Sequence, residues 1–343
     1  MMRFSRSLFF TLAVFLSVYV CAAMAQQPAV PSAPASQTPA PRRRAPRADK
    51  PFELHALTPE FWKLFDKKAK LETMGTGFGF TEGPVWDPAG FLWVSDELNN
   101  RIVKLYEDGH IEDMVSLVDP DGSTYDRHHR LLSTASGLRA VIRLSADGKS
   151  FETVVDHYQG KKLNTPNDIV IGPDGAVYFT DPTSDMTRGQ RQELPQSVYR
   201  MGADNSMTPL TTELKEPNGL AFSPNGKYLY IDDDYRKNIR RYKFHKDGTI
   251  SDGMDFGDMH DPVNHGVPDG MKVDKKGHLF VSGPNGIWVW NSKGVHIGTV
   301  QMPHGMANLT WGGPNYSKLY ITAGNTVYIL QTKTRGILGY LKK

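Results

Sequence analysis

Short apolar and aromatic runs, separated by turn residues, recur through most of the chain. Five segments repeat one order of features: a polar start, a strand-like run, a turn and a second strand-like run. They read TEGPVWDPAGFLWVSD, TPNDIVIGPDGAVYFTD, EPNGLAFSPNGKYLYID, VPDGMKVDKKGHLFVSG and HGMANLTWGGPNYSKLYITA. Asp-Gly and Asn-Gly pairs, which favour tight hairpins, recur in these segments. The pattern therefore predicts antiparallel strands joined by short turns.

The repeated unit also predicts the architecture. Most copies are followed by a third strand-like run, such as NIRRYKFHKDG, and a weaker sixth copy fits between Val118 and Gly148. Units of this size are too small to bury a sheet face alone, so they must pack against one another. We therefore expect an all-β fold, a six-bladed β-propeller with a central channel. The run from Lys68 to Met74 is expected to supply an outer strand that completes the last blade.

The N-terminal residues have a different character. Residues 1–25 combine arginines, the apolar run LFFTLAVFLSVYV and a small-residue site ending at Ala25, as in a cleaved secretory signal peptide. Residues 26–51 read as a Pro/Ala-rich linker with a basic end, and residues 52–343 as the propeller. We expect a periplasmic or secreted protein with no transmembrane span after cleavage near Ala25. Lipid attachment at Cys21 is the less favoured alternative.

Composition argues against several function classes. Cys21 is the only cysteine, which leaves the mature chain without disulfides or thiol chemistry, and no G-x-S-x-G elbow is present. The formal net charge is +3, but residues 1–50 hold seven Lys or Arg and one Asp. The remainder has 33 basic and 36 acidic residues, and this slightly acidic body argues against nucleic acid as a partner. The sequence does not specify an oligomeric state.

Two Asn-Gly pairs in EPNGLAFSPNGKYLYID have different explanations. Asn225-Gly226 lies between two strand-like runs and predicts a hairpin, whereas Asn218-Gly219 has no strand pattern immediately before it. Aligning the repeats on their first strands places an oxygen-bearing residue at this point in each copy. The aligned residues are Glu82, Asp121 (a weak match), Asn167, Asn218, Asp269 and Asn308. Because the innermost strands of a propeller run in one direction along the channel, these side chains are expected to converge at one channel end.

Four of the aligned residues form a ligand set for a hard cation. Glu82, Asn167, Asn218 and Asp269 offer two carboxylates and two amide oxygens, which suits Ca²⁺ completed by water. Zinc more often recruits His or Cys, although Zn²⁺, Mn²⁺ or Mg²⁺ would also be possible. Any one Asp-Gly or Asn-Gly pair alone is more simply a turn. Their shared place in the repeat favours a central site for one divalent cation.

At these residues the sequence resembles the senescence-marker-protein/gluconolactonase/luciferin-regenerating-enzyme family. The matching motifs are TEGPVW, KLNTPNDIVIGPDGAVYFTDP, EPNGLAFSPNGKYLY, VPDGMKVDKKGHLFV and NLTWGGPNYSKLYITA. The resemblance implies a six-bladed propeller with one catalytic divalent ion, held by the four residues above, with Asn167 also able to contact substrate. Characterised members are mostly hydrolases of sugar lactones.

Two departures from the family leave the substrate open. Animal members carry an Arg two residues before the Asn of the Asn-Asp pair, where this chain has Thr165, as in bacterial members. A stretch that often reads His-Gly-Asn-Arg-Arg in bacterial relatives is ASGLRAV here, from Ala135 to Val141. Both changes leave the expected ligand set intact.

The expected reaction is the hydrolysis of a lactone, such as gluconolactone. It requires a polarised carbonyl and an activated water, both of which a divalent ion can provide, and a base for the proton of the water. Asp269 is the first candidate for the base, with a ligand role as its alternative. Further candidates for contact with the substrate are Asn167, Thr165, Asp121, Asp181, His265 and Asn308. A structural cap is at least as good an explanation for Asp181, and an ordinary loop position for His265.

Two other functions fit the same sequence. One is a non-catalytic, metal-stabilised propeller that binds a protein or a sugar in the cell envelope. The other is an ester or organophosphate hydrolase that uses the same ion. A charged group of ligands in the channel favours an enzyme over a binding module, but it does not distinguish the two hydrolases.

Overall fold

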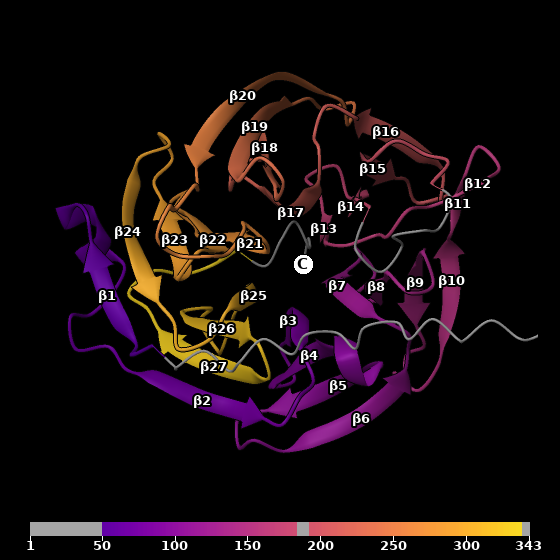
Figure 1. Cartoon of the computed structure of the whole chain (residues 1–343). Helices are drawn as coiled ribbons and strands as arrows, with labels where there is room; N and C mark the ends of the chain where they lie inside the picture. The colour runs from indigo at the N-terminus through magenta and orange to yellow at the C-terminus, as the bar shows by residue number, and fades with distance from the viewer. Residues whose placement is uncertain (1–49, 184–191, 338–343) are drawn as a thin grey trace, which may run out of the picture. The chain divides into compact units, whose positions relative to one another are not determined.

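The computed structural model describes residues 50–183 and 192–337, and these form one compact unit. The expected leader and nearly all of the expected linker lie outside the described residues. No helix in the described part of the chain is long and apolar enough to span a bilayer. Figure 1 shows six antiparallel sheets arranged around a common centre, the β-propeller that the repeats predict.

Each sheet is one blade, and its strands follow one another outward from the centre. Blade 1 consists of β3 (Thr81–Asp87), β4 (Phe91–Asp96), β5 (Arg101–Tyr106) and β6 (Ile111–Ser116). Blade 2, the weak sixth copy, consists of β7 (Pro120–Tyr125), β8 (Leu131–Ala135), β9 (Ala140–Leu144) and β10 (Phe151–Val155). Blade 3 consists of β13 (Ile169–Ile171), β14 (Val177–Asp181), β15 (Ser197–Met201) and β16 (Met207–Thr211). A separate hairpin of β11 (His157–Tyr158) and β12 (Lys161–Lys162) precedes blade 3.

The remaining blades include strands from both ends of the described chain. Blade 4 consists of β17 (Pro217–Phe222), β18 (Tyr228–Asp233), β19 (Asn238–Phe244) and β20 (Ile250–Asp258). Blade 5 consists of β21 (Met271–Val273), β22 (Leu279–Gly283), β23 (Gly286–Trp290), β24 (His296–Gln301) and the added edge strand β1 (Glu53–Ala56). Blade 6 consists of β25 (Met306–Gly312), β26 (Lys318–Ala323), β27 (Thr326–Gln331) and β2 (Leu71–Thr76).

The ring closes through the pairing of β2 with β27, as the run from Lys68 to Met74 predicts. Leu71 pairs with Leu330 and Thr76 with Thr326 in antiparallel register. The last blade therefore combines strands from near both ends of the described chain, which closes the ring. Strand β1 and the short 3₁₀ helix η1 (Pro59–Lys63) have no counterpart in the sequence expectations. Phe61 and Phe65 of this region are fully buried against blades 5 and 6.

The apolar core is divided among the interfaces between neighbouring blades. Six buried clusters, one for each interface, contain the side chains of the second and third strands. Strand β4 (FLWVSD) is buried at every residue because both faces of its blade are covered, whereas β10, at an outer edge, is exposed or half-buried throughout. The second strands therefore read as continuous apolar runs rather than as an alternation.

Candidate active site at the entry end of the inner strands

The aligned polar residues lie where the inner strands begin, which we call the entry end of the ring. Glu82, Asp121 and Asn218 are the second residues of β3, β7 and β17, and Asn167 and Asp269 stand two residues before β13 and β21. The six inner strands surround the centre of the ring in Figure 1. The repeat therefore brings five of the six aligned residues to equivalent places in five different blades.

The sixth aligned residue, Asn308, is one position out of register. The amide of Gly122 donates to the carbonyl of Asn167 over 3.0 Å, and the amide of Gly270 donates in the same way to Ala307 over 2.9 Å. Ala307 is thus the blade 6 counterpart of Asn167, and the predicted alignment of Asn308 is wrong by one residue. Its expected contact with a substrate stays a prediction. The misalignment arises because MANLTW has no Asx-Gly pair to mark the position, and Asn308 stands where four other blades have Gly.

Close contact between neighbouring blades explains the first Asn-Gly pair. A Cβ added at Gly219 would lie 2.1 Å from the carbonyl oxygen of Asp269, and one at Gly83 would lie 2.0 Å from that of Asp121. Only Gly permits such an approach of the next blade's backbone. Asn218-Gly219 is therefore a blade contact rather than a hairpin, whereas Gly226 has a φ of 66° in the turn between β17 and β18, as expected.

Hydroxyl groups on the second strands strengthen the same contacts. Ser95 donates to the carbonyl of Asp121 over 2.7 Å, and Ser282 donates to that of Ala307 over 2.6 Å. Thr134 donates to the carbonyl of Asn167. Because all three hydroxyls are buried, these bonds hold the backbone of the aligned residues firmly to the preceding blade.

Glu82 is buried, and its carboxylate is hydrogen-bonded on one side. Its Oε2 accepts the amide of Gly83 over 2.5 Å and the Nδ2 of Asn308 over 3.0 Å. Both bonds end on Oε2, and Oε1 accepts no hydrogen bond from the described residues. Burial, followed by the charge of Asp168, raises the pKa of Glu82 to about 7 even though these hydrogen bonds act in the opposite direction. Oε1 is therefore the oxygen available for another partner.

Asp121 and Asn167 form a polar pair between blades 2 and 3. The Nδ2 of Asn167 donates to Oδ2 of Asp121 over 2.9 Å, and Ser136 donates to the same oxygen over 3.2 Å. Burial, and then the charges of Glu82, Glu97 and Asp269, raises the pKa of Asp121 well above its usual range. Since the amide nitrogen of Asn167 is used by Asp121, its Oδ1 is the atom left for a ligand.

Asn218 and Asp269 have oxygen atoms without hydrogen-bond donors. The Oδ1 of Asn218 is buried and accepts no hydrogen bond from the described residues, and the carboxylate of Asp269 accepts none either. Burial, and then the charges of Glu82 and Asp232, raises the pKa of Asp269 well above its usual range. A buried oxygen such as Oδ1 of Asn218 is costly unless a cation or a donor compensates it.

Comparison with known proteins gives the family. The profile of the SMP-30/gluconolactonase/LRE-like region matches residues 80–325, which is most of the chain. This chain belongs to that family.

Several members of the SMP-30/gluconolactonase/LRE-like family or fold relatives are similar over most of the propeller. A gluconolactonase of Zymomonas mobilis is 29% identical over 314 residues, covering 82% of this chain and 86% of that protein. The pentonolactonase XacC of Haloferax volcanii is 26% identical over 247 residues, covering 70% and 80%. The structure of the gluconolactonase XC5397 from Xanthomonas campestris aligns with a TM-score of 0.73 at 29% identity, covering 83% and 99%. The calcium-binding regucalcin structure from Agrobacterium tumefaciens shares the fold, with a TM-score of 0.68 at 18% identity, covering 85% and 98%.

Within this family fold, the donor atoms at the entry end fit a hard cation. Glu82 Oε1, Asn167 Oδ1, Asn218 Oδ1 and the Asp269 carboxylate are all oxygens without donors among the described residues. Two of them belong to carboxylates, and the charge of Glu82 raises the pKa of Asp269. A divalent ion bound among them would offset the repulsion between the two carboxylates and would coordinate the oxygens that accept no hydrogen bond. No group of three or more His, Cys, Asp or Glu side chains in the described chain is arranged to hold an ion. The expected set differs from such a group because half of it is carboxamide.

Glu97 is a site residue that the sequence did not reveal. It begins the short 3₁₀ helix η2 (Glu97–Asn99) directly after β4. Burial, and then the charges of Glu82 and Asp119, raises the pKa of Glu97 to about 8, so this carboxyl lies within electrostatic reach of Glu82. The segment DELNN reads as an ordinary polar connection, and only the folded blade shows that Glu97 is close to the site.

Asp181 has a structural partner at the end of its strand. Asp181 is the last residue of β14 and accepts the amide of Asn164 over 2.9 Å. Asp96 and Asp233 end β4 and β18 and accept the amides of Gly79 and Lys215 over 2.8 Å each. The recurrence in three blades favours the structural cap for Asp181, although burial raises its pKa to about 7.

Two other expected substrate contacts differ in exposure. Thr165 is fully buried, and its hydroxyl donates to the carbonyl of Pro182 over 2.6 Å, so this hydroxyl is already used. His265 is exposed in the connection between β20 and β21. It makes no hydrogen bond or ion pair with the described residues, which favours the ordinary loop position.

A cavity of about 580 Å³ lies elsewhere, at the turn between β17 and β18, and none of the expected site residues lines it.

Proposed function

We propose that this protein opens a lactone by hydrolysis, using one divalent cation held at the entry end by Glu82, Asn167, Asn218 and Asp269. The enzyme class, a lactonase-like ester hydrolase, follows from membership of the family and from relatives named gluconolactonase and pentonolactonase. A sugar lactone such as gluconolactone is the preferred substrate. Ca²⁺ is the first choice of ion, and the fold relative described as calcium-binding supports that choice.

One observation carries the proposal. The buried Oδ1 of Asn218 lacks a donor in the described chain, and it belongs to the same ring of aligned residues as the mutually repelling carboxylates of Glu82 and Asp269. A binding platform that held no cation would gain nothing from concentrating uncompensated negative charge at this point. A hydrolase would, because the same charge retains the cation that its reaction needs.

The roles of the side chains follow from their surroundings. When bound, the cation would polarise the lactone carbonyl and stabilise the negative charge that develops on its oxygen. Asp269, whose carboxylate has no donor in the described chain, is free to accept a proton from the attacking water. Asp121 holds the amide nitrogen of Asn167 and so directs the carboxamide oxygen away from itself. Glu97 is a second nearby carboxyl able to hold a proton near neutral pH.

A substrate screen tests the proposal. The mature protein is freed of metal with a chelator, reloaded separately with Ca²⁺, Zn²⁺, Mn²⁺ or Mg²⁺, and assayed with aldonolactones, aliphatic lactones, aryl esters and an organophosphate triester. We expect turnover of an aldonolactone that the chelator abolishes and Ca²⁺ restores. Hydrolysis of esters or organophosphates alone would replace the lactone in the proposal, and ion binding without any turnover would favour the binding module.

A further inference from the structure

Lys272 carries the only charged side chain at its position in the repeat. The residues three places after the aligned positions of the six inner strands are Val85, Thr124, Val170, Ala221, Lys272 and Thr310. Five are small or β-branched, as inner strands favour, and the sixth is a long cation on β21. Its side chain is only 25% exposed. A half-buried ammonium near a cation site requires a specific reason, because a positive charge by itself would repel the ion.

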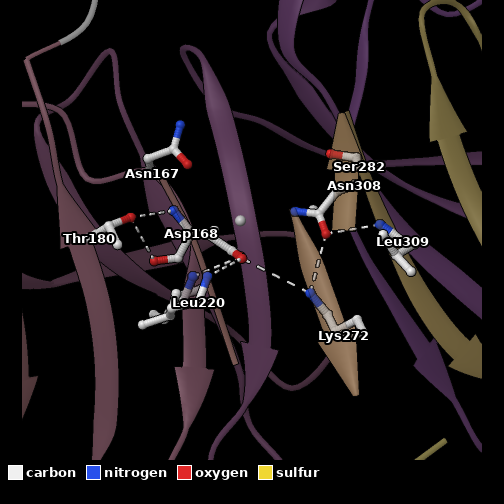
Figure 2. Close-up of polar contacts among 12 residues, drawn as sticks. Asn167, Asp168, Thr180, Leu220, Lys272, Ser282, Asn308 and Leu309 are labelled. Atoms are coloured by element: carbon white, nitrogen blue, oxygen red, sulfur yellow. Dashed lines mark hydrogen bonds and ion pairs between the residues drawn. The ribbon is translucent and has the colours of Figure 1, made fainter. Parts of the chain in front are cut away.

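The ammonium group of Lys272 lies between two other blades. Its Nζ is 3.2 Å from Oδ1 of Asn308 in blade 6 and 4.0 Å from Oδ2 of Asp168 in blade 3. Figure 2 shows Lys272 pointing at both side chains from its own strand. The carboxylate of Asp168 is fixed in turn by the amide of Ile169, over 2.9 Å. Lys272 therefore links three blades across the centre of the ring.

This contact is one of two that determine which way the carboxamide of Asn308 points. An ammonium can only donate hydrogen bonds, and the amide of Leu309 also donates to the same atom of Asn308, over 2.9 Å. The atom facing these two donors must be the carbonyl oxygen, Oδ1. Nδ2 then faces the other way, where it donates to Oε2 of Glu82 over 3.0 Å. A reversed carboxamide would set two donors against its nitrogen and an oxygen against the carboxylate.

These contacts fix the orientation of the Glu82 carboxylate. With Asn308 and the amide of Gly83 both bound to Oε2, the carboxylate is held at one oxygen and presents the other, Oε1. Residues behind a metal ligand often act in this way, by fixing its orientation. We propose that Lys272 is a positioning residue for the cation ligand Glu82, acting through Asn308. This inference depends on the proposed function, because it assumes that Glu82 holds an ion.

The two possible effects of Lys272 have opposite signs. If Lys272 acted only by its charge, removing the charge would reduce repulsion and tighten cation binding. If it positions Glu82, removing the ammonium leaves Oδ1 of Asn308 with the Leu309 amide as its one remaining donor, which holds the carboxamide less firmly and weakens binding. Lys272→Met keeps an unbranched side chain one atom shorter and removes the charge, so the direction of the change in affinity separates the two effects.

The experiment titrates Ca²⁺ alone into the metal-free mature protein by calorimetry. We expect Lys272→Met and Asn308→Ala each to weaken Ca²⁺ binding by about 10- to 100-fold, as for other residues that orient metal ligands. The double variant should be no weaker than the worse single variant, because both changes break one chain of contacts. Lys272→Arg, which keeps a donor for Asn308, should recover most of the affinity. Far-UV circular dichroism and melting in chelator establish that each variant is folded.

Lys243→Met on the exposed surface of β19 is the matched control. It removes one lysine charge from the third strand of its blade, away from the inner strands that carry the aligned residues. The affinity for Ca²⁺ should therefore stay unchanged. Wild-type-like or tighter Ca²⁺ binding by folded Lys272→Met would overturn the inference and leave the proposed function standing. If the wild-type protein binds no divalent ion, the cation site and the inference both fail.

Discussion

The Nδ2 of Asn167 donates to Oδ2 of Asp121 over 2.9 Å, which joins blades 2 and 3 at the entry end of the ring. The sequence gives these two residues as aligned members of a repeat, and the structure shows that one orients the other. A carboxylate can only accept from an amide, so the contact fixes the nitrogen of Asn167 on the side of Asp121. Its oxygen remains for a cation or a substrate.

Replacing Asp121 should therefore weaken the cation site through Asn167. Asp121→Ala frees the carboxamide of Asn167 and removes a charge near Glu82, and both effects should lower Ca²⁺ affinity, by about 10- to 100-fold. Asp121→Asn retains an acceptor oxygen and should lose less. Calorimetry with Ca²⁺ measures both variants. Equal affinity for wild type and Asp121→Ala would show that this contact does not orient a ligand.

Asp269 and Asn218 should respond differently to excess cation. Asp269→Asn retains shape and an oxygen but removes both a charge and the proposed base, so turnover at saturating Ca²⁺ should fall by about 100- to 10,000-fold. Asn218→Ala removes one neutral ligand and should be partly rescued by added Ca²⁺. Steady-state kinetics across a Ca²⁺ titration distinguish the two variants. Wild-type turnover by Asp269→Asn at saturating cation would leave Asp269 as a ligand only.

Gly219 should not tolerate even a methyl group. A Cβ there would lie 2.1 Å from the carbonyl oxygen of Asp269 and 2.8 Å from Oδ2 of Asp232. Gly219→Ala should therefore push the backbone of Asp269 away, destabilising the fold by about 1–3 kcal/mol and weakening cation binding. Gly305→Ala is the control, because a Cβ at Gly305 meets nothing within 4 Å. Urea unfolding in chelator and Ca²⁺ calorimetry report the two effects; parity between the variants would contradict the close-contact argument.

His278 should make stability depend on pH. Its Nδ1 lies 2.8 Å from Oδ2 of Asp274, and its Nε2 lies 3.3 Å from Oε1 of Glu60. The second contact connects blade 5 to η1. Burial lowers the pKa of His278, but the bonds and charges of Asp274 and Glu60 outweigh it and raise the pKa above 6.5. A raised folded-state pKa means that the stabilisation is complete below pH 6.5 and is lost as pH rises through the folded-state value.

His278→Gln provides the measurement for this pH effect. We expect the variant to be less stable than wild type by about 1–2 kcal/mol at acidic pH, with the difference shrinking as pH rises above neutral. Urea unfolding in chelator, at a series of pH values from acidic to alkaline, gives the free energy of unfolding without a contribution from bound cation. A difference that grows with rising pH would have the wrong sign for this ion pair.

Export is a separate proposal that rests on residues 1–25. We expect the mature protein to start near Gln26 and to be recovered from the periplasm or the medium. Intact-mass spectrometry of the natively expressed protein checks both the cleavage and Cys21. Retention of the leader would contradict export by cleavage, and a lipid on Cys21 would replace the freely released form with an anchored one.

Local patterns along the chain were enough to predict the six-bladed architecture and to propose most of the candidate site. The repeats predict six blades, their closure by the segment after Lys68, and equivalent places for Glu82, Asn167, Asn218 and Asp269. These features could be predicted because the same order of strand and turn residues in each repeat fixes where each residue lies along its own strand. Hydrophobic alternation and turn residues act over a few neighbouring residues, so their effects can be read without knowing the rest of the fold.

The contacts between neighbouring blades could be seen in the folded chain alone. It showed that Ala307, rather than Asn308, occupies the aligned position of blade 6. It also placed Glu97 within electrostatic reach of Glu82, and η1 and β1 against the last blades. It also showed that Lys272 of blade 5 donates to Asn308 of blade 6. The carboxamide of Asn308 donates in turn to Glu82 of blade 1, 226 residues away in the sequence. Contacts of this kind depend on the angle and spacing at which whole sheets pack, and no local pattern in the sequence encodes that geometry.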